Sequence, residues 1–365
     1  MTMEKLRISY ILDTFRGGGK ERRCLQVIQG LNRAGVTDIQ VVIVNNDVAY
    51  KELYETSAKV EIIDRKNRGL GQIQTAKELY RLLKGFQPEI VQAWGLMSAG
   101  VVLMVKPFMK FRFIASYVAD ADTPTGVYGF INRYCNLVCD KIVSNSKVGL
   151  AAYHTPKSKG VVIYNGFNES RFDNKIDKSL KKEELGINTS FVVAMVATFW
   201  QNKDWQCYID TAKRVIKQRE DITFLAIGKG PQWDYFNDQI KEEERPLIRM
   251  LGRRDDVDEL LQICTITVLT SNHGEGVSNS IMESMAWGVP VIASTGGGTP
   301  EIIEDNVNGK LINEQTPERV GTLITDLIDQ PDVLAQMSEK AAQTIQNSFL
   351  LHRMTEEYLK LYEVE

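Results

Sequence analysis

Residues 7–33 read RISYILDTFRGGGKERRCLQVIQGLNR, and this stretch decides the fold class. The apolar run Arg7–Leu12 has the length of a buried strand, and the glycines Gly17, Gly18 and Gly19 follow it closely. Apolar residues then recur at helical spacing, at Cys24, Leu25, Val27, Ile28 and Leu31. A strand, a glycine turn and a helix in this order predict the first unit of a parallel α/β sheet.

The same alternation of strands and helices continues and then restarts in the second half. Strands are predicted at Ile39–Val44, Lys59–Ile63, Glu89–Ala93, Phe113–Val118 and Lys141–Ser144, with a helix at Ile73–Leu83. The second set of strands is predicted at Phe191–Phe199, Ile222–Ile227, Ile248–Leu251, Ile266–Thr270, Val289–Ala293 and Lys310–Ile312. Helices are predicted between them, at Trp205–Gln218, Val257–Gln262, Ser278–Trp287 and Pro317–Leu327.

This pattern predicts an α/β protein with two doubly wound, Rossmann-like domains that face each other across a cleft. We expect an N-terminal domain over 1–170, a second domain over 171–345 and a C-terminal helix over 346–365 that returns to the first domain. The charged stretch Lys175–Glu184 is predicted to be a linker or hinge, and Leu334–Tyr362 is predicted to be helical throughout. Ligands are expected at the carboxyl ends of the strands.

The amino-acid composition excludes several classes of protein. Of 365 residues, 43% are hydrophobic and 25% are charged, which excludes a disordered chain. No run approaches the roughly 20 apolar residues that span a bilayer. The N-terminal run Ile8–Leu12 stops at Asp13 without a cleavage site, so a cytoplasmic protein is expected. Five cysteines in a chain of this length fit reduced thiols better than a disulfide framework.

Charge is divided unequally between the two halves. Residues 1–165 carry a net charge of +9 and residues 166–365 carry −12. This asymmetry indicates either an anionic partner for the first half or a solvated surface with uneven charge. Nucleic acid is not expected as a partner, because the basic residues are scattered and no nucleic-acid motif accompanies them.

Three stretches carry residues suited to binding an oxygen-rich anion. The Gly17–Gly19 turn before a helix offers backbone N–H groups, although a plain tight turn explains it equally well. Lys203, before a predicted helix, can place an ammonium at the edge of the sheet, as an ordinary surface lysine also would. The third stretch, 275–283, reads EGVSNSIME, with Glu275 and Glu283 eight residues apart across a glycine turn. Its turn frees N–H groups for phosphate or sugar oxygens, and a carboxylate is the usual acceptor for ribose hydroxyls.

Together with further motifs, this third stretch resembles the retaining GT-B glycosyltransferases of family 4 type. The shared elements are the E-x7-E pair, the run MAWGVPV at 285–291, the turn GGTPE at 297–301, the phrase IYNGFN at 163–168 with Phe172, and LGRRDDV at 251–257. They follow the family's order over nearly the whole chain. The resemblance implies a hexosyl- or N-acetylhexosaminyltransferase without metal or other cofactor, acting in capsular or other cell-surface polysaccharide assembly.

The resemblance also implies roles for individual residues. Glu283 would accept hydrogen bonds from the ribose, the Gly252–Arg254 turn would meet the base, and Lys203 would neutralise the diphosphate. Glu275 would contact the donor sugar near its reacting carbon. The implied donor-binding residues are Gly17, Gly18, Gly19, Thr198, Gly252, Arg253, Gly276, Val277, Ser278, Asn279 and Glu283, and the implied catalytic residues are Lys203, Glu275 and Asp120.

The chain also departs from the family's pattern. Thr198 stands where the family usually has an arginine five positions before the lysine; candidate replacements are Arg16, Lys20, Arg253 and Arg254. The histidine that many relatives carry in the N-terminal domain is missing, and Asp120 or Asp122 is a candidate group near the acceptor hydroxyl. His273, two residues before Glu275, is interpreted as structural rather than catalytic.

The expected partners are a nucleotide-sugar, UDP-sugar by default and GDP-sugar second, and a glycan or lipid-linked glycan acceptor. The segment Gly100–Phe113 mixes apolar and basic residues, which indicates either docking on an anionic membrane surface or a buried helix that runs into a strand. Two other functions stay open. A nucleotide-sugar epimerase of GT-B shape would use a similar cleft, and a non-catalytic nucleotide-sugar-binding protein would keep Lys203 and Glu283 without turnover.

Overall fold

The computed structural model describes residues 6–16, 18–118, 123–272 and 276–363. Contacts between residues divide the chain into two compact units, Met1–Gly166 with Leu351–Glu365, and Phe167–Leu350. The divisions thus fall at Gly166/Phe167 and Leu350/Leu351, against the expected 170/171 and 345/346. Within the described ranges, no helix combines the length and the apolar character that crossing a membrane requires.

The first unit is built on a parallel seven-stranded sheet in the order β3-β2-β1-β4-β5-β6-β7. Its strands are β1 (Ile8–Leu12), β2 (Ile39–Ile43), β3 (Lys59–Ile62), β4 (Ile90–Trp94), β5 (Arg112–Tyr117), β6 (Lys141–Ser144) and β7 (Gly160–Val162). Its helices are α1 (Gly19–Arg33), α2 (Gln72–Phe86), α3 (Leu96–Val105), α4 (Gly126–Val138), α5 (Lys147–Ala152) and α13 (Leu351–Tyr362), with short 3-10 turns η2 (Lys51–Glu55) and η3 (Lys106–Phe108).

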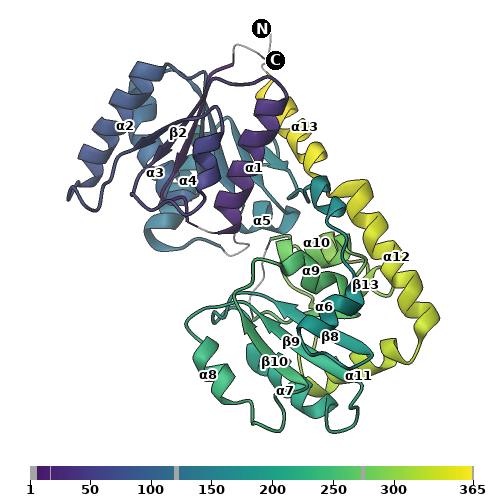
Figure 1. Cartoon of the computed structure of the whole chain (residues 1–365). Helices are drawn as coiled ribbons and strands as arrows, with labels where there is room; N and C mark the ends of the chain where they lie inside the picture. The colour runs from purple at the N-terminus through teal and green to yellow at the C-terminus, as the bar shows by residue number, and fades with distance from the viewer. Residues whose placement is uncertain (1–5, 17, 119–122, 273–275, 364–365) are drawn as a thin grey trace. The chain divides into compact units, whose positions relative to one another are not determined.

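Helices cover both faces of this sheet (Figure 1). Apolar residues of α1 and α13 form one core with β1, and those of α2, α3 and α4 form the core on the opposite face. The C-terminal helix α13 crosses α1 closely, because Gly30 has no side chain and Thr355 occupies the space where a Cβ would lie. Inside the first core, the Tyr10 hydroxyl lies 2.8 Å from that of Tyr362. Tyr362 of α13 is therefore part of the first unit's core.

The second unit contains a parallel six-stranded sheet in the order β10-β9-β8-β11-β12-β13. Its strands are β8 (Phe191–Val196), β9 (Ile222–Ile227), β10 (Ile248–Gly252), β11 (Ile266–Leu269), β12 (Val291–Ser294) and β13 (Gly309–Ile312). Its helices are α6 (Lys178–Glu184), α7 (Trp205–Val215), α8 (Trp233–Asp238), α9 (Val257–Gln262), α10 (Asn279–Ala286), α11 (Pro317–Ile328) and α12 (Pro331–Ser348), with 3-10 turns η4 (Glu169–Asp173) and η5 (Thr299–Glu301). Two doubly wound parallel sheets confirm the predicted fold class.

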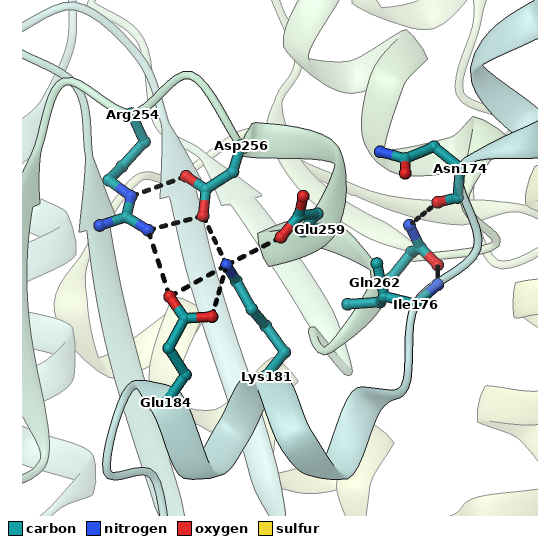
Figure 2. Close-up of polar contacts among 8 residues, drawn as sticks. All are labelled: Asn174, Ile176, Lys181, Glu184, Arg254, Asp256, Glu259 and Gln262. Carbon is teal, nitrogen blue, oxygen red and sulfur yellow. Dashed lines mark hydrogen bonds and ion pairs between the residues drawn. The ribbon is translucent and has the colours of Figure 1, made fainter.

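The prediction that Lys175–Glu184 is a linker or hinge was wrong in one respect, because most of this stretch forms the helix α6. Figure 2 shows why this lysine-rich segment is ordered. The ammonium of Lys181 is buried among three carboxylates, 2.7 Å from Asp256, 2.8 Å from Glu259 and 3.0 Å from Glu184. Arg254 adds a second cation, 2.6 Å from Asp256. The cluster fastens α6 to the start of α9, so charge pairing takes the place of an apolar face.

The predicted continuous helix over Leu334–Tyr362 was also wrong, since it is two helices. α12 ends at Ser348 and α13 starts at Leu351. Between them, Phe167 N–H donates to the carbonyl of Phe349 at 2.7 Å, and Phe167 pairs with Leu350 as an isolated β-bridge. The chain thus leaves helical geometry where its backbone bonds to another segment.

The charge cluster on α6 makes unfolding depend on pH in a defined direction. Hydrogen bonds from Arg254 and Lys181 hold the pKa of Asp256 well below its usual range. Such a carboxyl stabilises the fold above its unfolded pKa of about 3.9, and the contribution is lost as pH falls through the folded value. Burial alone would lower the pKa of Lys181, but its three carboxylate partners outweigh burial and raise it, so this lysine stays charged at neutral pH.

Asp256→Asn is therefore expected to lower the free energy of unfolding at pH 7 by about 1–2 kcal/mol. The difference from the unmodified protein should shrink as pH is lowered from about 4, because the unfolded unmodified chain then takes up a proton at Asp256 that folding must remove. Urea unfolding between pH 7 and pH 3 measures this. Asp255→Asn, at the exposed neighbouring position, is the matched control and should change little. Equal losses at pH 7 and pH 3 would contradict the assignment.

Candidate functional site

The predicted donor residues of the second unit gather at one edge of its sheet. Thr198 follows β8, Gly252 ends β10, and the stretch Gly276–Asn279 follows β11. Because these strands are parallel, their carboxyl ends share an edge. The strand order reverses direction at β8, between β9 on one side and β11 on the other. Ligands of such sheets bind at this switch point.

Lys203 lies at the switch point itself. It pairs as an isolated antiparallel bridge with Ser271, the second residue after β11, so the loop after β8 is joined to the loop after β11. The next residue, Asp204, accepts a hydrogen bond from Cys207 N–H at 3.0 Å and caps α7. Asp204 N–H in turn donates to the carbonyl of Thr270 at 3.0 Å. Lys203 is buried, with 8% of its surface exposed, and its backbone is held on both sides.

An aromatic stack holds the loop that carries Thr198. The rings of Phe199 and Trp205 are parallel with centroids 3.7 Å apart, and Trp205 Nε1 donates to the carbonyl of Thr198 at 3.0 Å. Gly228, at the end of β9, has a φ of +144°, and a Cβ there would lie 1.8 Å from the carbonyl oxygen of Ala197. Glycine is required at this position for the two loops to approach each other. Thr198 itself is exposed at this edge.

Glu283 lies in the second turn of α10 and is buried, with 7% of its surface exposed. Its Oε1 accepts a hydrogen bond from Arg171 Nη1 at 2.9 Å. Arg171 also donates from Nε to Asp258 at 2.8 Å, and Asp258 accepts from Trp287 Nε1 at 2.9 Å. The guanidinium carbon of Arg171 lies 4.5 Å from the centroid of the Phe167 ring. One arginine thus holds two carboxylates at the base of α10.

The charge state of this network follows from its geometry. Burial alone would lower the pKa of Arg171, but the hydrogen bond to Asp258 and the charge of Glu283 outweigh burial and raise it. The guanidinium therefore stays charged, and it fixes the orientation of the Glu283 carboxylate. Sequence reasoning missed Arg171 and Asp258, although each adjoins a quoted motif residue, Phe172 and Val257 respectively.

The start of α10 presents the other predicted donor-binding groups. Gly276 and Val277 are buried, and Ser278 is the extended residue that precedes the helix, with a φ of −73° and a ψ of 131°. Ser278 Oγ lies 3.0 Å from Ser280 Oγ. The first N–H groups of a helix have no intrahelical acceptor, so this end of α10 suits an anion.

A polar pocket of about 300 Å³ lies at the carboxyl ends of β11, β12 and β13. Ser271, Ser294 and Gln315 are among its lining residues. Gln315 Nε2 donates to Asp204 at 2.6 Å, and its Oε1 accepts from Ser271 N–H at 3.1 Å. The pocket therefore shares its hydrogen bonds with the loop that carries Lys203.

Of the candidate replacements for the missing arginine, three are engaged with carboxylates. Arg16 pairs with Asp47, Lys20 lies 2.6 Å from Asp13, and Arg254 binds Asp256. The fourth candidate, Arg253, is exposed next to Gly252 and forms no ion pair with any residue that the structure describes. Gly252 has a φ of +67°, which turns the chain sharply before Arg253.

The remaining predicted residues lie elsewhere. Gly18 and Gly19 belong to the first unit, where Gly18 precedes α1 and Gly19 is its first residue. Gly17, Asp120 and Glu275, together with Asp122 and His273, lie outside the described residues. Across the described ranges, no three His, Cys, Asp or Glu side chains meet in a cluster that could hold a metal ion.

Comparison with known proteins relates the second unit to a family of glycosyltransferases. Residues 177–344 match the family described as Glycosyl transferases group 1. The UDP-Gal:alpha-D-GlcNAc-diphosphoundecaprenol alpha-1,3-galactosyltransferase of Escherichia coli is 28% identical over 306 residues, which cover 78% of this chain and 77% of that protein. The lipopolysaccharide core biosynthesis glycosyltransferase LpsE of Rhizobium meliloti (strain 1021) is 20% identical over 347 residues, or 95% and 96% of the two chains.

A solved structure gives the same fold. Anabaena HepE, crystallised in complex with UDP, matches with a TM-score of 0.84 and 20% identity, covering 98% of this chain and 99% of HepE. Two parallel Rossmann-like sheets and these relatives define a glycosyltransferase with the GT-B fold. The similarity to the glycosyl transferases group 1 family is confined to residues 177–344, all of which lie in the second unit.

Proposed function

We propose that the protein transfers a sugar from a UDP-sugar to a hydroxyl of a glycan or lipid-linked glycan, with retention of configuration and without a metal ion. The observation that carries this proposal is the buried Glu283 carboxylate, oriented by Arg171 at the same sheet edge as Lys203. A fixed carboxylate suits paired ribose hydroxyls, and an ammonium carried by a fixed backbone suits a diphosphate.

Two relatives support the choice of donor and acceptor. Structures of HepE were obtained with UDP and with UDP-glucose. The name of the E. coli relative gives UDP-Gal as its donor and a GlcNAc-diphosphoundecaprenol as its acceptor. We accordingly propose action on the cytoplasmic side, at or near an anionic membrane surface, in the assembly of cell-surface polysaccharide.

The proposed chemistry needs charge stabilisation on the leaving group. When the bond from the anomeric carbon to the diphosphate breaks, negative charge develops on the β-phosphate. Lys203 and the N–H groups at the start of α10 stabilise that charge, which is the work a Mg²⁺ ion would otherwise do. The acceptor oxygen forms the new bond on the face that the diphosphate leaves, and its proton passes to a phosphate oxygen.

A thermal-shift panel without metal tests the proposal. UDP, GDP, ADP and the UDP- and GDP-sugars are added in the presence of EDTA. A ligand at 100 times its dissociation constant adds about 2.7 kcal/mol of stability, so UDP and a UDP-sugar should raise the melting temperature clearly. Stabilisation by GDP alone would overturn the donor assignment. Binding of a UDP-sugar without release of UDP in the presence of lipid-linked glycans would favour the non-catalytic function, which Thr198 in place of arginine also favours.

A further inference from the structure

Helix α4 of the first unit turns its apolar side outward. Val127, Phe130, Tyr134 and Leu137 are exposed over 75%, 73%, 44% and 72% of their surfaces. Their spacing of three, four and three residues places them on one side of the helix. The residues that α4 buries are Asn132 and Cys135. An ordinary surface helix has the opposite arrangement, so this apolar stripe is suited to a partner outside the unit.

An apolar groove runs beside the stripe. It encloses about 640 Å³, and its walls include Met97, Leu103 and Met104 of α3 and Tyr128 and Ile131 of α4. Figure 1 shows α2, α3 and α4 together on one face of the first sheet. Gly100 keeps α3 close to α4, since a Cβ there would lie 3.0 Å from Ile131 Cδ1. A groove of this volume and lining is suited to a hydrocarbon chain.

The segments that carry α3, η3 and α4 hold charges of one sign. Residues 96–118 and 126–138 together carry four basic residues and no acidic residue. Lys110 and Arg133 are exposed, and so is the ring of Phe108 in η3. An apolar surface with a basic fringe matches the boundary between acyl chains and anionic headgroups. A second copy of this chain fits less well, because a two-fold interface would set the same basic fringe against itself.

The expected docking segment Gly100–Phe113 is partly interior and partly exposed. Val101, Val102 and Val105 of α3 are at most 1% exposed, and β5 begins at Arg112. Met104, Phe108 and Lys110 reach the surface. Met104 lines the groove together with residues of α4, so the exposed part of the segment adjoins the α4 stripe.

We propose that the α4 stripe and the adjoining groove form a docking surface for a bilayer that contains anionic lipid, with a lipid chain entering the groove. This inference rests on the proposed function, since a lipid-linked acceptor would be presented on such a bilayer. The apolar residues supply the contact, and Lys110 and Arg133 supply the preference for negative charge.

Vesicle co-sedimentation of the full chain tests the docking surface. The vesicles are phosphatidylcholine, with or without phosphatidylglycerol. The unmodified protein is expected to bind the anionic vesicles and to lose binding at high salt. Leu137→Glu is expected to weaken that binding at least about tenfold, because it places a charge in the apolar contact. The matched control is Leu180→Glu on α6, where a leucine is 63% exposed, and this variant should bind like the unmodified protein.

Three outcomes overturn the inference: no binding to anionic vesicles, equal binding by Leu137→Glu and Leu180→Glu, or a dimer in light scattering that Leu137→Glu dissociates while vesicle binding is unchanged. The thermal shift with UDP, measured on the same proteins, separates this failure from a failure of the proposed function. Lys203 and Glu283, on which the proposed function rests, lie in the second unit, and α4 lies in the first. If UDP stabilises the protein but the protein does not bind vesicles, then the donor site is present and the docking surface is not.

Discussion

Replacing Lys203 by alanine is expected to lower kcat by about 10²–10³, the usual loss when one donor to a developing oxyanion is removed. Lys203 lies at the switch point of the second sheet, and its backbone is held by the bridge to Ser271. The ammonium acts mainly on charge that appears as the diphosphate departs. The loss should therefore appear in kcat more than in KM for the donor.

Because Lys203 is buried, its alanine variant also loses the packing of the side-chain stem. Lys203→Met keeps most of that stem and removes only the charge, so it should lose nearly as much activity as Lys203→Ala. Lys217→Ala, at an exposed position beyond α7, is the control and should remain fully active. Release of UDP from a UDP-sugar in the presence of acceptor measures all three. Near-normal turnover in a folded Lys203→Met protein would contradict the assignment.

The strands could be predicted because parallel strands buried on both faces are continuous apolar runs. Phe191–Val196 and Ile222–Ile227 are of this kind, and both are interior strands of the second sheet. Helix α6 was missed because its order depends on Lys181, whose three carboxylate partners include Asp256 and Glu259, more than seventy residues away in sequence. The spacing of apolar residues within a segment does not predict ion pairs with residues that are distant in the sequence.

Helix α4 was missed for a different reason. Four of its apolar residues, Val127, Phe130, Tyr134 and Leu137, are exposed at helical spacing. The side that faces the core buries Asn132 and Cys135 fully and Ile131 and Val138 only in part. A prediction that assigns every apolar residue to the core does not recognise a helix of this kind. Departures of this kind are expected where a surface serves a partner rather than the fold.

Site residues that lie within a recognisable sequence motif could be predicted. Contacts between side chains that are far apart in the sequence could not. Lys203, Gly252 and Glu283 were expected from the motifs that resemble the family, and they lie before α7, at the end of β10 and within α10. Arg171 comes from η4, 112 residues before Glu283, and nothing in its own neighbourhood indicates that contact. The residue that orients the predicted ribose acceptor was therefore visible only in three dimensions.

Arg171→Ala is expected to weaken the donor site and the fold together. The change leaves Glu283 and Asp258 as two buried or half-buried carboxylates without their shared cation. Breaking one partner from a buried ion pair costs about 3–5 kcal/mol, so a loss near the lower end is expected in urea unfolding. The donor KM should rise at least about tenfold, because the Glu283 carboxylate is no longer held toward the ribose.

A double-mutant cycle separates positioning from simple stability. If Arg171 acts on the donor through Glu283, then Arg171→Ala combined with Glu283→Gln should bind UDP no more weakly than Glu283→Gln alone. Arg171→Lys keeps the charge but not the two-pronged geometry that reaches both carboxylates, so it should recover stability more fully than donor affinity. A folded Arg171→Ala protein with an unchanged KM would show that the arginine serves the fold alone. Additive losses in the double variant would show that it acts on the donor by a route other than Glu283.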